Sequence, residues 1–353
     1  NAGKRCSTYE SYLKPALKRR NLTVLSHATV TRLLLKGTQC SGVELKLGRN
    51  LARISAEKIL LASGAIGSPQ LLLCSGIGPA DHLRSLSIGV NLDAPEVGQN
   101  LRDHLEVYIQ QQCKQPVTLN AHLGLVGKGL IGARWLLTKD GLGATNHFET
   151  GGFIRDGSKA AWPNIQFHFL PAAMTYAGDL ATQGHGFQVH VGPMSSESKG
   201  TLKLRSADIT DTPELRFNYM SEAADWEVFR AAIRGARHIF SQPALDGFSD
   251  GEISPGVDAD SDSALDAFVR AHAESAYHPC GTCRMGSDKD AVVDPLGRVN
   301  GVENLWVADS SVFPHLTNGN LNAPTIMLAE KIADQVRGRS LAPQPEPWFG
   351  QPA

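Results

Sequence analysis

The order of apolar and polar positions divides the chain into two kinds of sequence. Near the beginning and the end, short apolar runs alternate with helical patterns, which is typical of an α/β domain. In the middle, apolar and polar residues alternate singly, as in antiparallel strands with one solvated face. We therefore expect one domain made of residues 1–105 and 276–340, a second domain inserted over 106–275, and a Pro-rich tail over 341–353.

The expected elements follow from these patterns. The first part predicts a helix over 9–18 and strands over 22–26, 28–35, 41–47 and 58–62. A tight turn at Ser63-Gly64 then leads to a helix opened by Ser68-Pro69. The middle predicts strands over 165–171, 187–194 and 200–206 and helices over 223–240 and 263–273. The last part predicts a strand ending in Asp309 and a helix over 323–336.

Composition removes several classes of function. The net charge is −1, from 34 basic and 35 acidic residues, so there is no electrostatic reason to expect nucleic acid as a partner. The sequence has no apolar run of about 18 residues and hence no predicted membrane-spanning helix, although peripheral membrane contact stays open. Six cysteines in 353 residues are too sparse for a disulfide scaffold. The first residues read like the middle of a domain.

Two segments imitate metal sites, and neither fits well. The acidic segment 258–262 resembles the start of a calcium loop, but its sixth and twelfth positions are Ser and Val rather than Gly and Glu, so we interpret it as a helix start. Cys280 and Cys283 form a CxxC without a second ligand pair, which argues against zinc. A hydrolase using Cys280 and His278 is an alternative, but nothing in the sequence marks an oxyanion hole. We expect no metal site and interpret both cysteines as packing residues.

Three polar residues near the end of the chain suit redox chemistry on a nucleotide cofactor. Asp309 ends a strand, where a carboxylate can accept ribose or ribityl hydroxyls; the alternative is an ordinary helix-capping or loop residue. His278 is followed by Pro279, which restrains its backbone, and histidine is the usual base for removing an alcohol proton. Asn322 precedes a helix, where asparagine is also a favoured cap. Only a pairing with His278 gives it a further role.

Several longer segments together resemble the glucose–methanol–choline (GMC) oxidoreductase family, which depends on FAD. They are GAIGSPQLLLCSGIG (64–78), VGQNLRDH (97–104), HPCGTCRMG (278–286), VVDPLGRVNGVENLWVADSSVFP (292–314) and GNLNAPTIMLAEKIAD (319–334). The resemblance runs from about Ser7 to Gly338. It implies an incomplete α/β FAD-binding (Rossmann-like) domain with an inserted α+β antiparallel-sheet substrate domain.

Within the family, the chain resembles choline-oxidising members most, through DHLEVYIQQQCKQPVTL, NHFETGGFIR, IQFHFLP and VHVGPM. The resemblance implies that His278 is the catalytic base and Asn322 its paired amide. It also implies that Glu149 faces the trimethylammonium group; the alternative is that Glu149 is an ordinary surface residue of a strand. Contacts to FAD are implied for Val30, Ser63, Gly64, Asp309 and Ala323. Aromatic faces would also bind a quaternary ammonium, and Phe148, Trp135, Trp162 and Trp226 are available.

The family's usual beginning, a GxGxxG loop that holds the FAD pyrophosphate, is absent from the first 60 residues. We therefore expect the chain to be a C-terminal fragment or a truncated isoform. The implied activity is oxidation of choline to betaine aldehyde in glycine betaine synthesis, with electrons passing to a respiratory quinone or another acceptor. The implied location is the mitochondrial inner membrane or matrix side in a eukaryote and the cytoplasmic membrane in a bacterium. The alternatives are a family member with an uncharged substrate and an inactive fragment unable to bind FAD.

Overall fold

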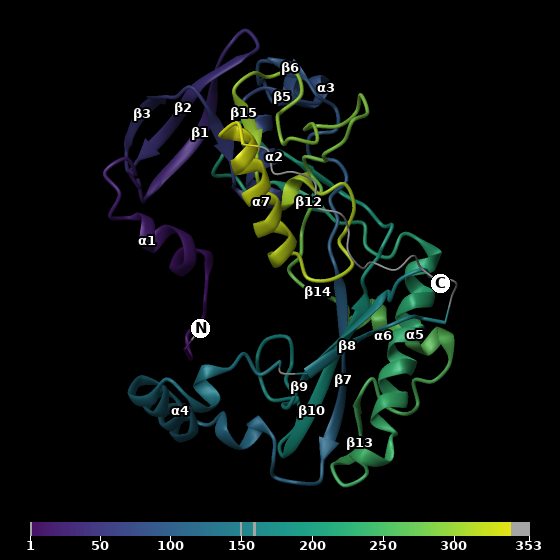
Figure 1. Cartoon of the computed structure of the whole chain (residues 1–353). Helices are drawn as coiled ribbons and strands as arrows, with labels where there is room; N and C mark the ends of the chain where they lie inside the picture. Colours follow the sequence, from purple (N-terminus) through teal and green to yellow (C-terminus); the bar gives the residue numbers. More distant parts are fainter. Residues whose placement is uncertain (1, 149, 158–159, 340–353) are drawn as a thin grey trace. The chain divides into compact units, whose positions relative to one another are not determined.

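The computed structural model describes residues 2–148, 150–157 and 160–339, which fold as two compact units (Figure 1). The first, which we call the α/β unit, comprises His27–His104, Met194–Asp225 and Ser275–Ala353. The second, which we call the sheet unit, comprises Asn1–Ser26, Leu105–Pro193 and Trp226–Glu274. The observed boundaries at 104/105 and 274/275 lie within one residue of the predicted boundaries at 105/106 and 275/276. Two further segments fall differently from the prediction.

Met194–Asp225 belongs to the α/β unit rather than to the inserted domain. The backbones of Leu101 and Gly200 exchange hydrogen bonds of 3.0 and 2.7 Å, and Leu202 is buried in the core of that unit. Conversely, Asn1–Ser26 belongs to the sheet unit, where the indole of Trp135 donates to the carbonyl of Gly3 at 2.6 Å. The predicted tail over 341–353 lies outside the described residues.

The α/β unit combines short parallel strand pairs with antiparallel hairpins. Its elements are β1 (Ala28–Lys36), β2 (Gln39–Leu47), β3 (Asn50–Ser55), β4 (Ile59–Leu61), α2 (Gly64–Cys74), β5 (Ile77–Gly78), α3 (Ala80–Ser85), β6 (Leu92–Asp93), β11 (Thr201–Lys203), β12 (Glu214–Arg216), β15 (Leu305–Val307) and α7 (Asn322–Val336). Strands β1, β2 and β3 form an antiparallel sheet, and β11 pairs with β12. Strands β4 and β15 are parallel, as are β5 and β6. The parallel pairs confirm the α/β character expected from the sequence.

Helix α2 begins at Gly64, four residues before the predicted start at Ser68. Pro69 therefore lies inside the helix, and it has no N–H to donate to the carbonyl of Ala65 one turn earlier. The hydroxyl of Thr282 donates to that carbonyl instead, at 2.6 Å. A hydroxyl from a distant part of the chain thus supplies the hydrogen bond to the Ala65 carbonyl that Pro69 cannot supply.

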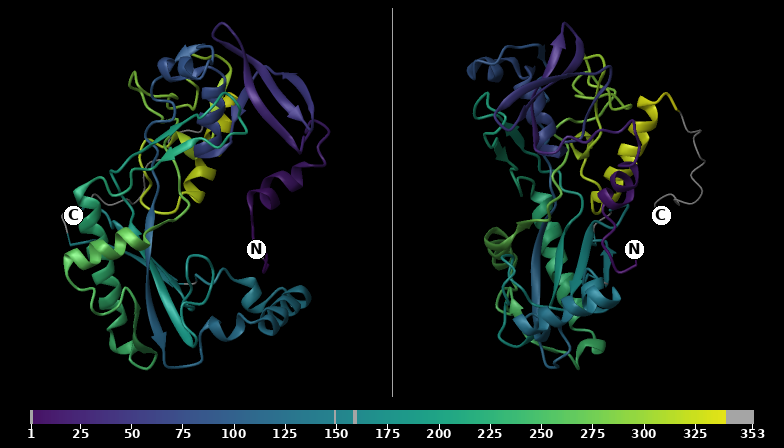
Figure 2. Two further views of the ribbon diagram at one scale, coloured as in Figure 1. Left: turned by 180° about the vertical axis from the view of Figure 1, so that it is seen from behind. Right: turned by 90° about the vertical axis from the view of Figure 1, so that its left-hand side faces the viewer.

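The sheet unit is an antiparallel sheet covered on one face by helices. Its elements are the short π-helix Tyr9–Leu13, α1 (Lys14–Ala16), β7 (Leu105–Cys113), α4 (Leu125–Thr138), β8 (Thr150–Ile154), β9 (Ile165–Leu170), β10 (His185–Pro193), most of α5 (Ala223–Phe240), β13 (Ser249–Ser254) and α6 (Asp262–His272). Strand β14 (Glu274–Ser275) lies at the boundary between the two units in the sequence and pairs with β7. The strand order is β13-β7-β10-β9-β8. Helix α5 runs along the sheet (Figure 2), and the ring of Phe240 packs edge-on against Phe187 of β10.

Some predicted elements differ from the observed ones. Residues 22–26, predicted as a strand, are irregular and exposed, because no strand of the described chain pairs with them. The helix predicted over 9–18 is helical from Tyr9 to Ala16, although its first part, Tyr9–Leu13, is π-helical and only the short α1 is α-helical. The elements that were not predicted include strands β3, β7, β8 and β13 and helix α4. The helix-start interpretation of 258–262 is confirmed, because α6 begins at Asp262 and the hydroxyl of Ser261 accepts from the Ala264 N–H at 3.2 Å. None of the helices within the described ranges has the length and apolar content needed to cross a membrane.

The bond between Thr282 and Ala65 leads to a testable prediction. Replacing Thr282 by Val keeps the side-chain shape but leaves a buried carbonyl without this donor, so the free energy of unfolding should fall by about 1–3 kcal/mol. The matched control is Thr325→Val: its hydroxyl donates to the Leu321 carbonyl, which also receives the Thr325 N–H at 2.9 Å. Urea titration of both variants measures the difference, and equal losses would contradict the prediction.

Candidate active site

The carboxylate of Asp309 joins the ends of the two parallel strands in the α/β unit. It follows β15 and is buried. One oxygen accepts from the Gly64 N–H at 3.0 Å and from the Ser68 hydroxyl at 2.5 Å, both at the beginning of α2. The other oxygen accepts from the Ser311 N–H at 2.8 Å. The chain itself therefore uses most of the acceptor capacity of Asp309, and the predicted contact to FAD stays a prediction.

A hollow of about 420 Å³ opens beside these strand ends. It is lined by Ser63, Gly64, Ala65, Ile66, Tyr277, His278, Pro279, Ser310, Leu321, Asn322 and Thr325. Ligands of open α/β sheets bind outside the carboxyl ends of the strands, which is where this hollow lies. The structure therefore brings together four of the predicted site residues, namely Ser63, Gly64, His278 and Asn322.

The backbone of His278 is held by a buried carboxylate. The His278 N–H donates to one oxygen of Asp103 at 2.8 Å. The other oxygen of Asp103 accepts from the hydroxyls of Tyr219 at 2.7 Å and Ser275 at 2.5 Å. Asp103 is only 5% exposed, so these bonds replace the water that the carboxylate loses on burial. The direction of His278 thus depends on a residue that lies far away in the sequence.

The imidazole of His278 contacts two side chains. Its Nδ1 lies 3.0 Å from Nδ1 of His104, and the two rings are nearly perpendicular. Its Nε2 lies 3.4 Å from the amide nitrogen of Asn320. The ring is half-buried and borders the hollow through residues on both sides. One nitrogen of His278 therefore points to the protein interior, and the other points to an amide near the start of α7.

The remaining predicted residues are placed as follows. Asn322 is the first residue of α7 and lines the hollow with His278, but the amide contact to the ring comes from Asn320. Ala323 follows it on the exposed beginning of α7. Val30 lies on β1 and packs against the core of the α/β unit, and it is not among the residues that line the hollow. Glu149 lies outside the described residues.

The two cysteines of the CxxC segment are buried, as expected for packing residues. Burial and, to a smaller extent, the charge of Asp103 raise the pKa of the Cys280 thiol to about 12. Burial also raises the pKa of the Cys283 thiol. Protonated thiols are poor nucleophiles and poor metal ligands, which argues against the hydrolase alternative. Among the residues that the structure describes, no cluster of His, Cys, Asp and Glu is arranged to hold a metal ion.

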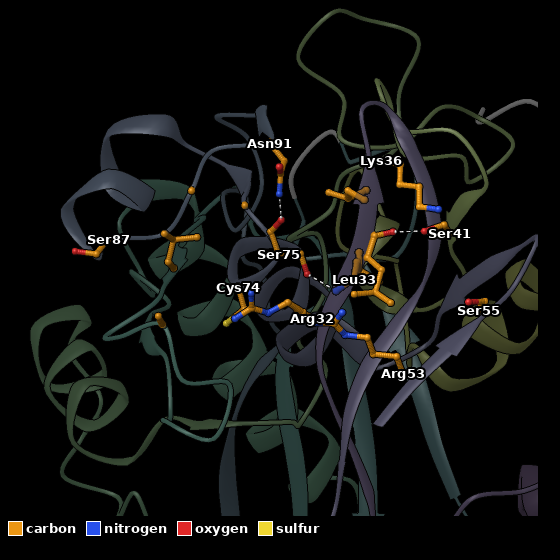
Figure 3. Close-up of a pocket in the computed structure, with 16 residues that line it drawn as sticks. Arg32, Leu33, Lys36, Ser41, Arg53, Ser55, Cys74, Ser75, Ser87 and Asn91 are labelled. Carbon is orange, nitrogen blue, oxygen red and sulfur yellow. Dashed lines mark hydrogen bonds between the residues drawn. The ribbon is translucent and has the colours of Figure 1, made fainter. Parts of the chain in front are cut away.

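A larger hollow, of about 690 Å³, lies elsewhere in the α/β unit, between the β1–β2–β3 sheet and the end of α2 (Figure 3). At its centre, Ser75 accepts from the Leu33 N–H at 2.8 Å, and its carbonyl accepts from the Asn91 amide at 2.8 Å. The titratable side chains on its wall are Arg32, Lys36, Arg53 and Cys74. None of these offers a base for alcohol oxidation near neutral pH. We therefore place the candidate active site at the smaller hollow.

In the sheet unit, the sheet face opposite α5 carries a row of aromatic side chains. Tyr108 of β7 pairs in register with His190 of β10, and His190 pairs with His168 of β9. The rings of Tyr108 and His190 stack with centroids 3.8 Å apart, and Phe148 packs edge-on against His190 at 5.2 Å. Because strand residues alternate between the two faces, the apolar neighbours Val189 and Val191 lie on the helix-covered face.

A carboxylate belongs to the same row. Glu106 accepts from Nδ1 of His190 at 3.0 Å, while the amide of Gln188 donates to Nε2 of that ring at 2.7 Å. Of the predicted aromatic residues, only Phe148 lies on this row. The indole of Trp135 is bonded to Gly3, Trp162 is exposed, and Trp226 stacks under the guanidinium of Arg270 at 4.3 Å.

Sequence reasoning missed His104, Asp103, Asn320, Tyr108 and His190. The sequence did contain a signal for His190. In β10 it stands at a polar position between the apolar residues Val189 and Val191, which places its side chain on the opposite face of the sheet. His104 and Asp103 end the segment VGQNLRDH, which was used only for the family resemblance. Their contacts to His278 join residues more than 170 positions apart, and no local pattern predicts such a pairing.

Known proteins match this chain along most of its length. The family model described as GMC oxidoreductase matches residues 1–106 with its N-terminal part and 196–329 with its C-terminal part. An "Oxygen-dependent choline dehydrogenase" of Burkholderia lata is 54% identical over 349 residues, covering 98% of this chain and 62% of that protein. A protein of the same name from Brucella canis is 50% identical over 352 residues, covering 98% and 64%. The chain thus spans less than two thirds of these relatives.

Solved structures show a similar fold. Pyridoxine 4-oxidase from "Mesorbium loti" superposes with a TM-score of 0.84 and 29% identity, covering 97% of this chain and 63% of that one. A variant formate oxidase from Aspergillus oryzae gives a TM-score of 0.88 at 23% identity, covering 96% and 64%, which is evidence of fold alone. The two matched family segments and these similarities confirm the resemblance drawn from the sequence motifs. This chain belongs to the GMC oxidoreductase family.

Proposed function

We propose that the protein to which this chain belongs oxidises choline to betaine aldehyde, with FAD as cofactor and His278 as the base. The observation that carries the proposal is the position of His278 on a hollow at the carboxyl ends of β4 and β15. The substrate is supported by relatives named choline dehydrogenase that are 50–54% identical over 98% of the chain. The product connects the reaction to glycine betaine synthesis.

The residues around the hollow fit part of the FAD that this family uses. The volume of about 420 Å³ lies within the range of about 300–1,000 Å³ typical of ligand sites. Gly64 has a φ of +77°, and an added Cβ there would meet no atom within 4 Å, so open space remains above its backbone. Ser63, Gly64 and Asn322 would therefore hold the cofactor beside His278. FAD, when bound, supplies the hydride acceptor.

His278 suits the proton-transfer part of the reaction. An imidazole nitrogen must come within hydrogen-bond reach of the substrate hydroxyl, and Nε2 is the nitrogen directed away from the buried His104. The amide of Asn320 contacts Nε2, and Asn322 lines the hollow with His278, so both are available to donate to the substrate oxygen as its proton leaves. Asp103 holds the backbone of His278 during the transfer.

The sheet unit offers a surface with the chemistry that a quaternary ammonium requires. Such a group cannot donate ordinary hydrogen bonds, so aromatic faces and a nearby carboxylate must recognise it. The rings of Tyr108, His190 and Phe148 and the carboxylate of Glu106 form such a surface. We propose Glu149, next to Phe148 in the sequence, as a second carboxylate for the same group.

The electron acceptor and the location are also proposals. From the family resemblance we expected a respiratory quinone, whereas the printed name of the relatives favours oxygen. We propose oxygen on that basis. The relatives named above are bacterial, which favours the bacterial alternative of the location, association with the cytoplasmic membrane, over the mitochondrial one.

The role of His278 is tested by its removal. In protein loaded with FAD, His278→Ala should lower kcat for choline by roughly 100-fold or more, because the general base is lost. His315→Ala replaces an exposed histidine of the same unit and should leave kcat unchanged. Steady-state kinetics with choline gives both values. Unchanged choline oxidation in His278→Ala would remove this histidine from the mechanism.

The choice of choline over an uncharged alcohol is tested at Glu149. Replacement by Gln should raise KM for choline by about 10-fold or more, because the attraction to the ammonium is lost. It should barely affect 3,3-dimethyl-1-butanol, which has the same shape but no charge. Glu57→Gln, at an exposed position of the other unit, serves as the control. Equal effects on the two substrates would favour a family member with an uncharged substrate.

The acceptor is tested with an oxygen electrode. Choline should drive oxygen consumption by the FAD-loaded protein at a rate close to its turnover with an artificial electron acceptor. A rate at least about 100-fold lower with oxygen, restored by a soluble quinone, would instead support the quinone.

A further inference from the structure

We propose that His104 sets the protonation tautomer of His278. In this arrangement Nδ1–H of His278 donates to Nδ1 of His104, and Nε2 of His278 keeps the lone pair that receives the alcohol proton. His104 is then a positioning residue for the base. The importance of this effect for catalysis rests on the proposed function of His278, but the protonation of the two rings is decided by geometry within the α/β unit alone.

The first step concerns Nε2 of His104. It lies 3.1 Å from the carbonyl oxygen of Met194 and 3.0 Å from that of Thr317. Carbonyl oxygens only accept hydrogen bonds, so a lone pair on Nε2 would be repelled by both. Nε2 of His104 must therefore carry a hydrogen. Because both partners are backbone atoms, this assignment does not depend on the orientation of any side-chain amide.

The second step concerns the charge of His104. The residue is 1% exposed, and burial disfavours a charged imidazolium because the charge loses its contact with water. His104 is therefore neutral. A neutral imidazole with its hydrogen on Nε2 has an acceptor at Nδ1.

The third step determines which nitrogen of His278 carries the hydrogen. The two Nδ1 atoms are 3.0 Å apart, and the ring planes meet at 88°. One hydrogen lies between them, and since Nδ1 of His104 is an acceptor, the hydrogen belongs to His278. Neutral His278 then carries its lone pair on Nε2. The contact from the Asn320 amide to Nε2 at 3.4 Å agrees with an acceptor at that atom.

This arrangement lets His278 take up a proton without rearrangement. When Nε2 accepts the hydroxyl proton, the bond from Nδ1–H to His104 remains and becomes charge-assisted, which stabilises the imidazolium. Carboxylates and carbonyls behind catalytic or metal-binding histidines act in the same way. Here a second, neutral histidine fills that role. Without an acceptor behind it, His278 would divide between two tautomers, one of which cannot act as a base at Nε2.

The direct test is nitrogen NMR of FAD-loaded protein with 15N-labelled histidine, with the His278 signals assigned through a His278→Gln variant. The expected spectrum of His278 shows a protonated Nδ1 and an unprotonated Nε2 in its neutral form. The opposite tautomer would overturn the proposal. The measurement needs no activity, so it stands even if the protein does not oxidise choline. If His278 shows the expected tautomer but the protein does not oxidise choline, the proposed function is overturned and the tautomer assignment stands.

A matched pair of variants tests the consequence. His104→Asn places an amide oxygen near the former Nδ1 and keeps an acceptor, whereas His104→Leu has a similar shape and no acceptor. His104→Leu should lower kcat for choline by about 10- to 100-fold with little change in KM, and its His278 spectrum should show mixed tautomers. His104→Asn should recover most of the lost turnover and the single tautomer. An equal loss in both variants without a change of tautomer would show a merely structural role and overturn the proposal.

Discussion

The geometry of the α/β unit depends on one buried carboxylate, Asp309, which binds the ends of two parallel strands together. Strands β4 and β15 are only three residues long each, and their backbone pairing alone would hold the following loops weakly. The three hydrogen bonds of Asp309 tie the end of β15 to the beginning of α2 and to the turn at Ser311. The hollow that borders His278 lies at this junction.

A second buried carboxylate, Asp103, holds the backbone of His278 in place. It takes the N–H of His278, so the backbone of a loop residue is held as firmly as one in regular structure. The next residue, His104, contacts the ring of the same histidine. One short segment before β7 therefore orients both the backbone and the side chain of the proposed base.

The two units contribute different chemistry. The α/β unit places a histidine and amides around a hollow that fits part of a flavin. The sheet unit presents aromatic rings and a carboxylate in register across three strands. Its other face is apolar and covered by α5. Strand alternation thus separates the part of the sheet that stabilises the unit from the part that can recognise a cation.

The sequence by itself determined the family and the α/β character, because these depend on contiguous motifs and on local periodicity. Helix α7 was predicted within one residue for the same reason. The sequence also predicted His278 as a site residue, and the structure places that residue on the hollow. The start of α2 was misplaced, because the proline rule is local whereas the compensating hydroxyl of Thr282 comes from more than 200 residues away. The roles of His104, Asp103 and Asn320 were decided only by the tertiary structure. Hydrogen bonds between buried groups link residues by their positions in space, and the spacing of those residues along the chain carries no record of them.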